Sequence, residues 1–352
     1  MIRLFILLLF LLGCGKPITE SNEKDKTKNA LKEGVIEGRY LDQNMFMNFN
    51  YLPMTGEIKD QKKFWSGDSW RLKFGSVNYR WNSPNHETRH YTSPHPRDLK
   101  KYSLEDLKQL SPTEKYDLWL GRYDYFLKNL VESYLPERPL DWEGLCHGWS
   151  GASMNHSEPT PKTMMNPDGI LIPFGSADIK ALLTYYYSLE TVPDTFQLGR
   201  RCERYKLLDD DNCNEDLTPV DFHTVIANKL GLRGESFIMD IDRYLEVWNH
   251  PIISFKSEII KDIRKKGRNR KVTLRTSLYY VDVTLKNSWT PTIGTLAHII
   301  SKQQLEYELE LTPSGNMIDG KWISRDRPDF IWTMNKVEKF TGYLSGLNEL
   351  IK

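Results

Sequence analysis

The sequence of 352 residues has only four cysteines, almost no net charge and no visible internal repeat. So few cysteines exclude a small scaffold held together by disulfides. A formal net charge of +1 offers no bulk attraction to polyanions, so we expect no nucleic-acid partner. Aromatic residues are plentiful, with 10 Trp, 18 Tyr and 14 Phe, which is enough to build the core of one large domain or two small ones.

No apolar run is long enough to cross a bilayer. The longest, residues 4–12, follows Arg3 and fits the core of a signal peptide. It ends in Leu11-Leu12-Gly13-Cys14, which resembles a bacterial lipobox, with a plain secretory signal as the alternative. We therefore expect residues 1–13 to be removed, Cys14 to carry lipid, and the protein to be exported and anchored at the bacterial cell envelope. Gly15, in place of an aspartate, favours the outer membrane.

The residues after the lipobox are polar and charged. Residues 14–39 contain too little apolar surface to fold, so we interpret them as a flexible tether. Residues 40–352 are then expected to form a single catalytic domain, acting as a monomer. The basic stretch 261–271 is interpreted as a solvated surface loop.

A glycine- and tryptophan-rich segment surrounds one cysteine, Cys146. It is flanked by Trp142 and Trp149, and small residues follow it. Glycines allow a close backbone approach, and a thiol at the start of a helix is favoured as thiolate. The alternative is a buried cysteine in a tryptophan-rich core. We interpret Cys146 as a nucleophile, with Trp142 and Trp149 as aromatic walls for substrate.

The other two cysteines, Cys202 and Cys213, lie close together in the sequence. Because Cys14 is assigned to lipid and Cys146 to catalysis, they remain as a disulfide pair in an exported protein. The acids between residues 209 and 216 offer oxygen ligands that suit Ca²⁺, but their spacing is not that of an EF-hand. A solvated loop is the alternative, and no metal-ligand residues are assigned.

Periodicity predicts an α+β fold, with a helical half that carries Cys146 packed on an antiparallel sheet. Ser111 and Pro112 start a helix that continues to Tyr134. The other predicted helices are residues 178–187 and 224–230, the latter closed by Gly231, and the predicted strands are 236–242, 272–286 and 304–311.

A thiol, an imidazole and a carboxylate in that chain order would form a cysteine-nucleophile triad. His223 lies at the start of the helix before strand 236–242, and Asp240 and Asp242 lie on one face of that strand. A triad of this kind attacks a carboxamide, releases ammonia or an amine, and leaves a thioester. Water then gives hydrolysis, whereas an amine gives transfer.

The sequence resembles the transglutaminase elicitor family, first described from oomycetes. The main matches are Trp142-Glu-Gly-Leu-Cys-His-Gly-Trp149, Phe222-His223 with Ala227-Asn228, and Glu246-Val-Trp-Asn-His-Pro251. Supporting matches are Asn78-Tyr-Arg-Trp81, Ser111-Pro-Thr-Glu-Lys-Tyr116, Gly320-Lys-Trp-Ile323 and Arg327-Pro-Asp-Phe330, and the pair Cys202 and Cys213 falls where that family has cysteines.

The resemblance implies a papain-like fold and protein-glutamine γ-glutamyltransferase activity on glutamine and lysine side chains, linked in that family to calcium. It implies Cys146 as nucleophile, His223 as base and Asp240 as acid, with Asp242 as helper. No cofactor is required for the chemistry. The alternatives are a cysteine protease, amidase or deamidase acting on envelope proteins or peptidoglycan peptides, and a non-catalytic lipoprotein that binds peptide.

Overall fold

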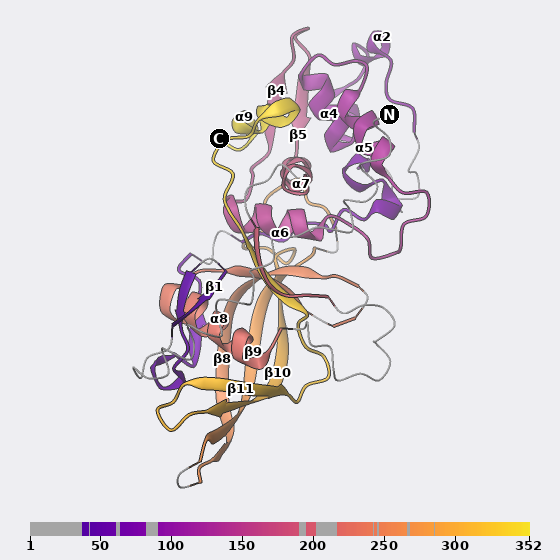
Figure 1. Ribbon diagram of the computed structural model, residues 1–352. Coiled ribbons are helices and arrows are strands. Elements are labelled where there is room, and N and C mark those ends of the chain that lie inside the picture. Colours follow the sequence, from indigo (N-terminus) through magenta and orange to yellow (C-terminus); the bar gives the residue numbers. More distant parts are fainter. Residues whose placement is uncertain are drawn as a thin grey trace.

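The computed structural model describes most of the chain beyond residue 36. The described residues are 37–41, 43–60, 64–81, 91–189, 195–201, 217–241, 243–244, 246–265, 268–284 and 286–352. Within them, helices gather in one half of the molecule and long strands in the other (Figure 1). The predicted α+β fold, with helices packed on an antiparallel sheet, is confirmed.

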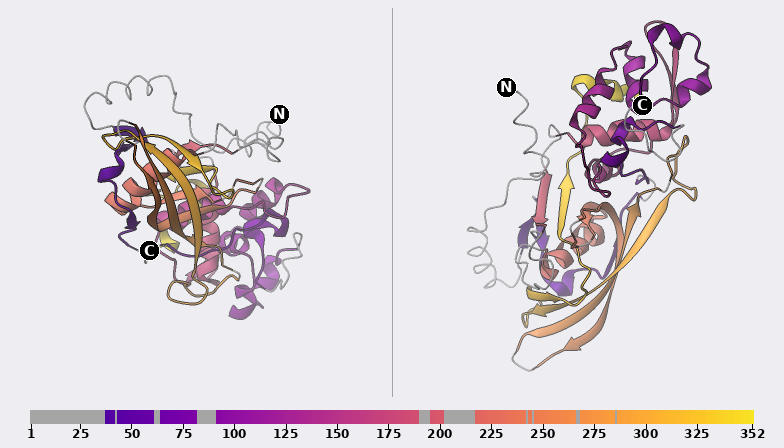
Figure 2. Two further views of the ribbon diagram at one scale, coloured as in Figure 1. Left: turned by 90° about the horizontal axis from the view of Figure 1, so that it is seen from below. Right: turned by 90° about the vertical axis from the view of Figure 1, so that its right-hand side faces the viewer.

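The sheet half is built around eight antiparallel strands in the order β11-β10-β9-β8-β7-β12-β6, with β3 paired to β8. The long central strands curve away from the helical half (Figure 2). Their bounds are β3 Thr55–Glu57, β6 Thr195–Gly199, β7 Phe237–Asp240, β8 Asn249–Ile263, β9 Arg270–Asp282, β10 Ile299–Leu311, β11 Met317–Trp322 and β12 Phe330–Met334. Two hairpins are separate: β1 Glu37–Tyr40 with β2 Gln43–Phe46, and β4 Lys162–Met165 with β5 Leu171–Phe174.

The helical half lies between the first strands and the sheet in the sequence. Its α-helices are α2 Pro96–Leu99, α3 Leu104–Lys108, α4 Pro112–Trp119, α5 Phe126–Tyr134, α6 Cys146–Asn155 and α7 Ser176–Tyr187, joined by α9 Leu347–Leu350 from the C-terminus. Short 3₁₀ turns cover Phe49–Tyr51, Leu72–Phe74, Ser76–Asn78 and Gly342–Gly346. On the sheet side, α8 Pro219–Ile226 continues into the π-helix η7 Ala227–Arg233.

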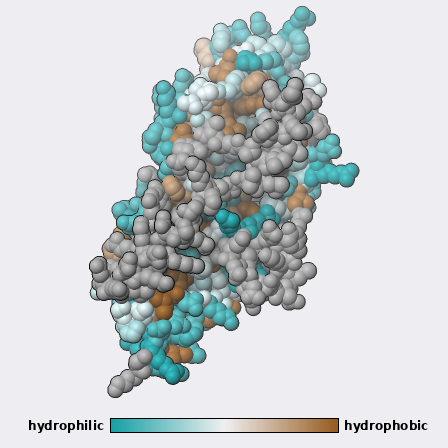
Figure 3. All heavy atoms as spheres, in the orientation of Figure 1, coloured by the Kyte–Doolittle hydropathy of each residue, from teal (hydrophilic) through white to brown (hydrophobic). Residues whose placement is uncertain are grey.

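The two halves share one apolar core that extends from Leu41 to Leu350. Because β12 lies inside the sheet while α9 returns to the helices, the end of the chain links the halves (Figure 1). On the face shown in Figure 3, hydrophilic side chains cover much of the two ends, and apolar ones form small groups among them. None of the helices in the described ranges is long and apolar enough to span a bilayer.

Local sequence signals explain several helix starts. Ser111 caps α4 through a reciprocal capping box with Glu114, and Pro112 occupies the first helical position, as predicted. The predicted continuous helix to Tyr134 is wrong, however. The chain turns after Trp119, and Tyr125 adopts a left-handed conformation with φ +52° before α5 begins. A tight turn of this kind interrupts the intrahelical hydrogen bonds.

Two other predictions need correction. The helix after His223 is not closed at Gly231, because it widens into η7 and ends at Gly234, which has φ +65°. The stretch 261–271 is not a loop throughout: β8 extends to Ile263 and β9 begins at Arg270, and their charged side chains pair across the strands. Strand β8 itself was not predicted.

Helices α6 and α7 pack so closely that only small residues fit between them. A Cβ atom added at Gly148 would collide with the hydroxyl of Ser188 and the backbone carbonyl of Thr184. All twelve residues of α7 are buried, so this helix has little freedom to move away. The small residues that follow Cys146 therefore fix α6 against the centre of the helical half.

We expect Gly148→Ala to lower the free energy of unfolding by about 1–3 kcal/mol, because overpacking at a rigid contact forces backbone shifts. Urea unfolding followed by circular dichroism measures the change. An unchanged unfolding midpoint would contradict the close packing of α6 on α7.

Candidate active site around Cys146

Cys146 is the first residue of α6, the helix that lies between the two halves (Figure 1). Its position is set by the segment before it, where the Leu145 N–H donates to the Ser69 carbonyl at 2.7 Å. The Cys146 side chain is buried, and its thiol contacts the Val247 carbonyl oxygen at 3.4 Å. The thiol therefore lies at a helix N-terminus, as the sequence predicted, and faces the segment that leads into β8.

Asn249, the first residue of β8, holds the thiol from the other side. Its Nδ2 lies 3.7 Å from Sγ. The Trp332 indole donates to Asn249 Oδ1 at 2.7 Å, and Ser150 on α6 donates to the Asn249 carbonyl at 2.7 Å. This amide is therefore fixed by β12 and α6 together, so it presents its N–H groups to sulfur in a constant orientation.

The environment of the thiol does not ionise it in the resting protein. Burial raises the pKa of Cys146, while hydrogen bonds from the Asn249 amide and from the backbone N–H groups of Asn249 and His147 oppose that rise. The carboxylate of Asp240 raises the pKa further. A base that removes the proton is therefore needed before Cys146 can act as a nucleophile.

His250 is a buried histidine of the strand whose first residue, Asn249, contacts the thiol, and it has a carboxylate partner. It follows Asn249 in β8, and its ring packs edge-on against Trp149, one turn along α6 from Cys146, at 5.8 Å between centroids. Its Nδ1 lies 3.0 Å from the Val281 carbonyl and 3.7 Å from Asp282 Oδ1. Since a carbonyl can only accept, Nδ1 carries the proton and Nε2 remains as the basic nitrogen.

Asp282 is held in place at the end of β9. Ser301 donates to its Oδ2 at 2.6 Å, and the Val283 N–H donates to its Oδ1 at 2.7 Å. Burial lowers the pKa of His250, and the nearby Asp282 carboxylate raises it. Among the described contacts, no hydrogen bond joins the ring to the Cys146 thiol. Catalytic hydrogen bonds are often long in a substrate-free enzyme and tighten when substrate binds.

The predicted base, His223, is not brought to Cys146. Its Nδ1 lies 2.8 Å from the Tyr307 hydroxyl, and its ring stacks on Phe49. In the sheet register, Tyr307 of β10 and Ile259 of β8 both pair with Leu274 of β9. Ile259 and Asn249 are then roughly 30 Å apart at about 3.3 Å per strand residue. We therefore correct the prediction: His223 is a core histidine of α8.

Burial without a charged partner lowers the pKa of His223 to about 3. The unfolded chain binds its proton near pH 6.5, so the neutral imidazole stabilises the fold above pH 6.5 and this contribution is lost as the pH falls toward 3. Between pH 7.5 and pH 5 we expect wild type to lose about 2 kcal/mol more unfolding free energy than His223→Asn. Urea unfolding at both pH values measures this, and equal losses in both proteins would be contrary to the buried, uncharged histidine.

Of the two predicted acids, Asp240 and Asp242, the structure describes only Asp240. Asp240 ends β7, is fully buried, and accepts a hydrogen bond from the Trp248 N–H at 2.9 Å. It pairs in register with Asn249, and its carboxylate raises the pKa of Cys146, so it lies near the thiol. Asp242 lies outside the described residues. Asp240 therefore stays a prediction, and Asp282 is the carboxylate that lies near His250.

Of the two predicted aromatic walls, Trp142 is partly exposed and Trp149 is buried. Trp149 is wholly buried and its indole N–H donates to the Trp65 carbonyl at 3.3 Å, so it is a core residue beneath the site. Trp142 is partly exposed, with the Arg201 guanidinium 5.5 Å from its ring centroid. Trp142 alone remains a candidate for contact with substrate. Cys14, Cys202 and Cys213 lie outside the described residues, and Cys146 is a free thiol.

A model of the transglutaminase elicitor family matches residues 139–266. This range contains Cys146, Asn249 and His250. The chain is also similar to the crystal structure of the GP42 transglutaminase from Phytophthora sojae, with 20% sequence identity and a TM-score of 0.64. The similarity covers 89% of this chain and 94% of that chain, and at this identity it establishes the fold. No curated protein matches the sequence.

The sequence did not predict that His250 and Asp282 lie together. His250 belongs to Glu246-Val-Trp-Asn-His-Pro251, one of the matching segments, so its position was visible. Its carboxylate neighbour was not, because Asp282 is far away in the sequence and reaches it only through the pairing of β8 with β9.

Proposed function

We propose that this protein is a protein-glutamine γ-glutamyltransferase, with Cys146 as nucleophile, His250 as base and Asp282 as the carboxylate that orients the imidazole. The observation that carries the proposal is that β8 brings Asn249 to the Cys146 thiol and the next residue, His250, to Asp282 and to Trp149 of the helix that Cys146 starts. The family match over residues 139–266 and the fold similarity to GP42 support the same chemistry.

In the first step, the thiol proton of Cys146 passes to His250 Nε2 as sulfur attacks the side-chain carboxamide carbon of a glutamine. The tetrahedral intermediate then collapses, the C–N bond breaks, and ammonia leaves with the proton from His250. A thioester between Cys146 and the glutamyl side chain remains. The N–H groups of Asn249 and His147, which now bond sulfur, are placed to stabilise charge near the reacting carbon.

In the second step, a lysine amine attacks the thioester, His250 takes its proton, and Cys146 is released as an isopeptide bond forms. Water in place of the amine gives glutamate, which is the deamidase outcome. The burial of the thiol favours transfer, because it limits the access of water to the thioester.

The test is to measure ammonia release and dansyl-cadaverine incorporation with a glutamine-rich protein, with and without Ca²⁺. We expect ammonia and incorporated amine in similar amounts. Ammonia without incorporation would instead establish a deamidase, and cleavage of the polypeptide without ammonia would establish a protease.

Calcium is suggested by the family resemblance and by the acidic stretch 209–216. Among the described residues, no group of three or more His, Cys, Asp or Glu side chains could hold a metal ion, and the acidic stretch 209–216 lies outside them. The steps above are written for the side chains of this protein alone, and the assay with and without Ca²⁺ measures whether the ion affects the rate.

The proposed setting is the bacterial envelope. The lipobox at Cys14 supports export and lipid anchoring there, and the pair Cys202 and Cys213 is proposed as a disulfide. In that setting the partners would be envelope or target proteins that present glutamine and lysine, and the protein would act as a monomer.

A further inference from the structure

One hydrogen bond determines which end of the Asn249 side chain faces the Cys146 thiol. An asparagine side chain has an oxygen that only accepts and an NH₂ group that only donates. The Trp332 indole N–H can only donate, so the amide atom that it contacts at 2.7 Å is the oxygen, Oδ1. The NH₂ group is then left to face the thiol, and Nδ2 lies 3.7 Å from Cys146 Sγ. The orientation of this amide therefore follows from the chemistry of the indole.

Both partners in this bond are buried. Trp332 and Asn249 are each 4% exposed, so bulk water has little access to the amide oxygen. If the indole N–H were lost, that oxygen would be left buried without its donor, which is unfavourable. A turned amide would place the oxygen against sulfur, where it repels a thiolate. The indole therefore favours the one orientation in which Asn249 donates toward sulfur.

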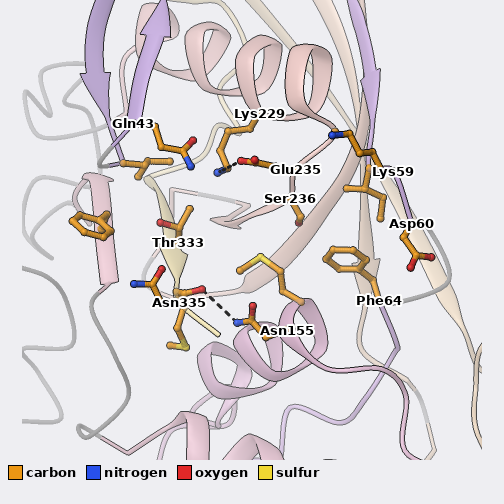
Figure 4. Close-up of a pocket in the computed structure, with 16 residues that line it drawn as sticks. Gln43, Lys59, Asp60, Phe64, Asn155, Lys229, Glu235, Ser236, Thr333 and Asn335 are labelled. Carbon is orange, nitrogen blue, oxygen red and sulfur yellow. Dashed lines mark hydrogen bonds and ion pairs between the residues drawn. The ribbon is translucent and has the colours of Figure 1, made fainter. Parts of the chain in front are cut away.

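Trp332 is itself held against α6. In the sheet, β7 lies between β12 and β8, so the indole reaches across β7 to Asn249. Two residues further along β12, a Cβ atom added at Gly151 of α6 would lie 2.6 Å from Met334 Sδ. Asn155, at the end of α6, donates to the Met334 carbonyl at 3.4 Å, beside the pocket drawn in Figure 4. Because residues two apart in a strand share a face, Trp332 and Met334 both face α6.

We propose that Trp332 is a positioning residue of the Cys146 site, which holds the Asn249 amide with its N–H groups toward sulfur. The amide then stabilises negative charge first on the thiolate and, as sulfur attacks, near the carboxamide oxygen of the tetrahedral intermediate. The second effect rests on the proposed transferase function, whereas the first requires only the thiol. Trp332 acts through Asn249 and needs no contact with substrate.

The test follows iodoacetamide labelling of Cys146 against pH, by mass spectrometry of the full chain after digestion. Trp332→Phe keeps an aromatic ring but lacks the N–H. We expect the apparent pKa of labelling to rise by about one unit, as for loss of a hydrogen bond to a charged group. The rate at pH 7 then falls about 10-fold and approaches the wild-type rate at high pH. A fall by the same factor at every pH would indicate altered access to the thiol and would contradict the inference.

A double variant shows whether Trp332 acts through Asn249. In Asn249→Ala there is no amide to orient, so adding Trp332→Phe should change the labelling rate by less than about twofold. A further fall of about 10-fold would mean that the indole acts by another route, and would overturn the inference. The titratable groups nearest the thiol, which are His147 of α6 and Asp240 of β7, and the proposed base His250 are kept in every variant.

Trp322→Phe is the matched control. Trp322 of β11 is also buried, and its indole N–H donates to the Leu217 carbonyl at 2.8 Å, so this variant loses the same kind of bond outside the site. It should label at the wild-type rate. If urea unfolding shows that Trp332→Phe does not fold, Asn249→Asp decides, because it keeps an acceptor for the indole and places a carboxylate oxygen at sulfur. Unchanged labelling at pH 7 in that variant would equally overturn the inference.

Labelling does not depend on transferase activity, so the two proposals can fail separately. With a glutamine-rich protein, Trp332→Phe should lower kcat for ammonia release about 10-fold and leave KM within about twofold, because the amide acts on the intermediate rather than on binding. A wild-type protein without ammonia release would contradict the proposed function, and the labelling profiles would still decide the role of Trp332.

Discussion

Cys146→Ala is expected to abolish both ammonia release and amine incorporation, with a loss of about 10³-fold or more. Without the thiol no thioester can form, and removing a nucleophile generally eliminates nearly all of the rate enhancement. The side chain is small and lies at the first position of α6, so we expect the fold to be retained. Both products are measured in the cadaverine assay, with urea unfolding as the check on stability.

Cys146→Ser is the matched control, because it keeps the size and the hydrogen-bonding capacity of the side chain. We expect it to be as inactive as the alanine variant, since a serine hydroxyl is far harder to ionise than a thiol. Substantial activity in folded Cys146→Ala would exclude covalent catalysis at this residue.

His250→Gln is expected to lower the rate of ammonia release by about 10²–10⁴-fold, the usual contribution of a general base. The glutamine amide can still bond the Val281 carbonyl but cannot take a proton from the thiol. His223→Asn is the comparison variant and should retain activity within about threefold at pH 7.5, because His223 contacts Tyr307 and lies far from Cys146.

The two histidine variants separate the sequence-based assignment from the structural one. A large loss in His223→Asn, with His250→Gln still active and both proteins folded, would restore His223 as the base. Asp282→Asn adds a further check. It removes the negative charge that orients the ring, while the asparagine oxygen can still accept the hydrogen bond from Ser301, so we expect a lower rate.

Features that depend on neighbouring residues could be predicted from the sequence. The position of Cys146 at a helix start follows from the glycines and small residues around it. Gly148 allows α7 to come close to α6, because a larger residue there would collide with α7. The start of α4 follows from Ser111 and Pro112. Such signals act over a few residues, so the sequence contains them directly.

The proposed base and acid could not be predicted, because strand register brings them together. His250 and Asp282 meet only because β8 pairs antiparallel with β9 near the start of one and the end of the other. The alternation of side chains along a strand assigned Asp240 to one face of its strand, but this pattern could not identify which strand lies next to it. His223 was favoured because it precedes an acidic strand, yet the helix carries it toward Tyr307 and into the core.

The central claim is that His250 activates the Cys146 thiol, and the rate of Cys146 alkylation tests it most directly. Iodoacetamide labelling is followed on the Cys146 peptide by mass spectrometry as a function of pH, in wild type, His250→Gln and His223→Asn. Because burial and the Asp240 carboxylate raise the pKa of this thiol, we predict that labelling at pH 7 falls about 10-fold in His250→Gln and stays at the wild-type rate in His223→Asn. An unchanged rate in His250→Gln, or an equal fall in His223→Asn, would contradict the account.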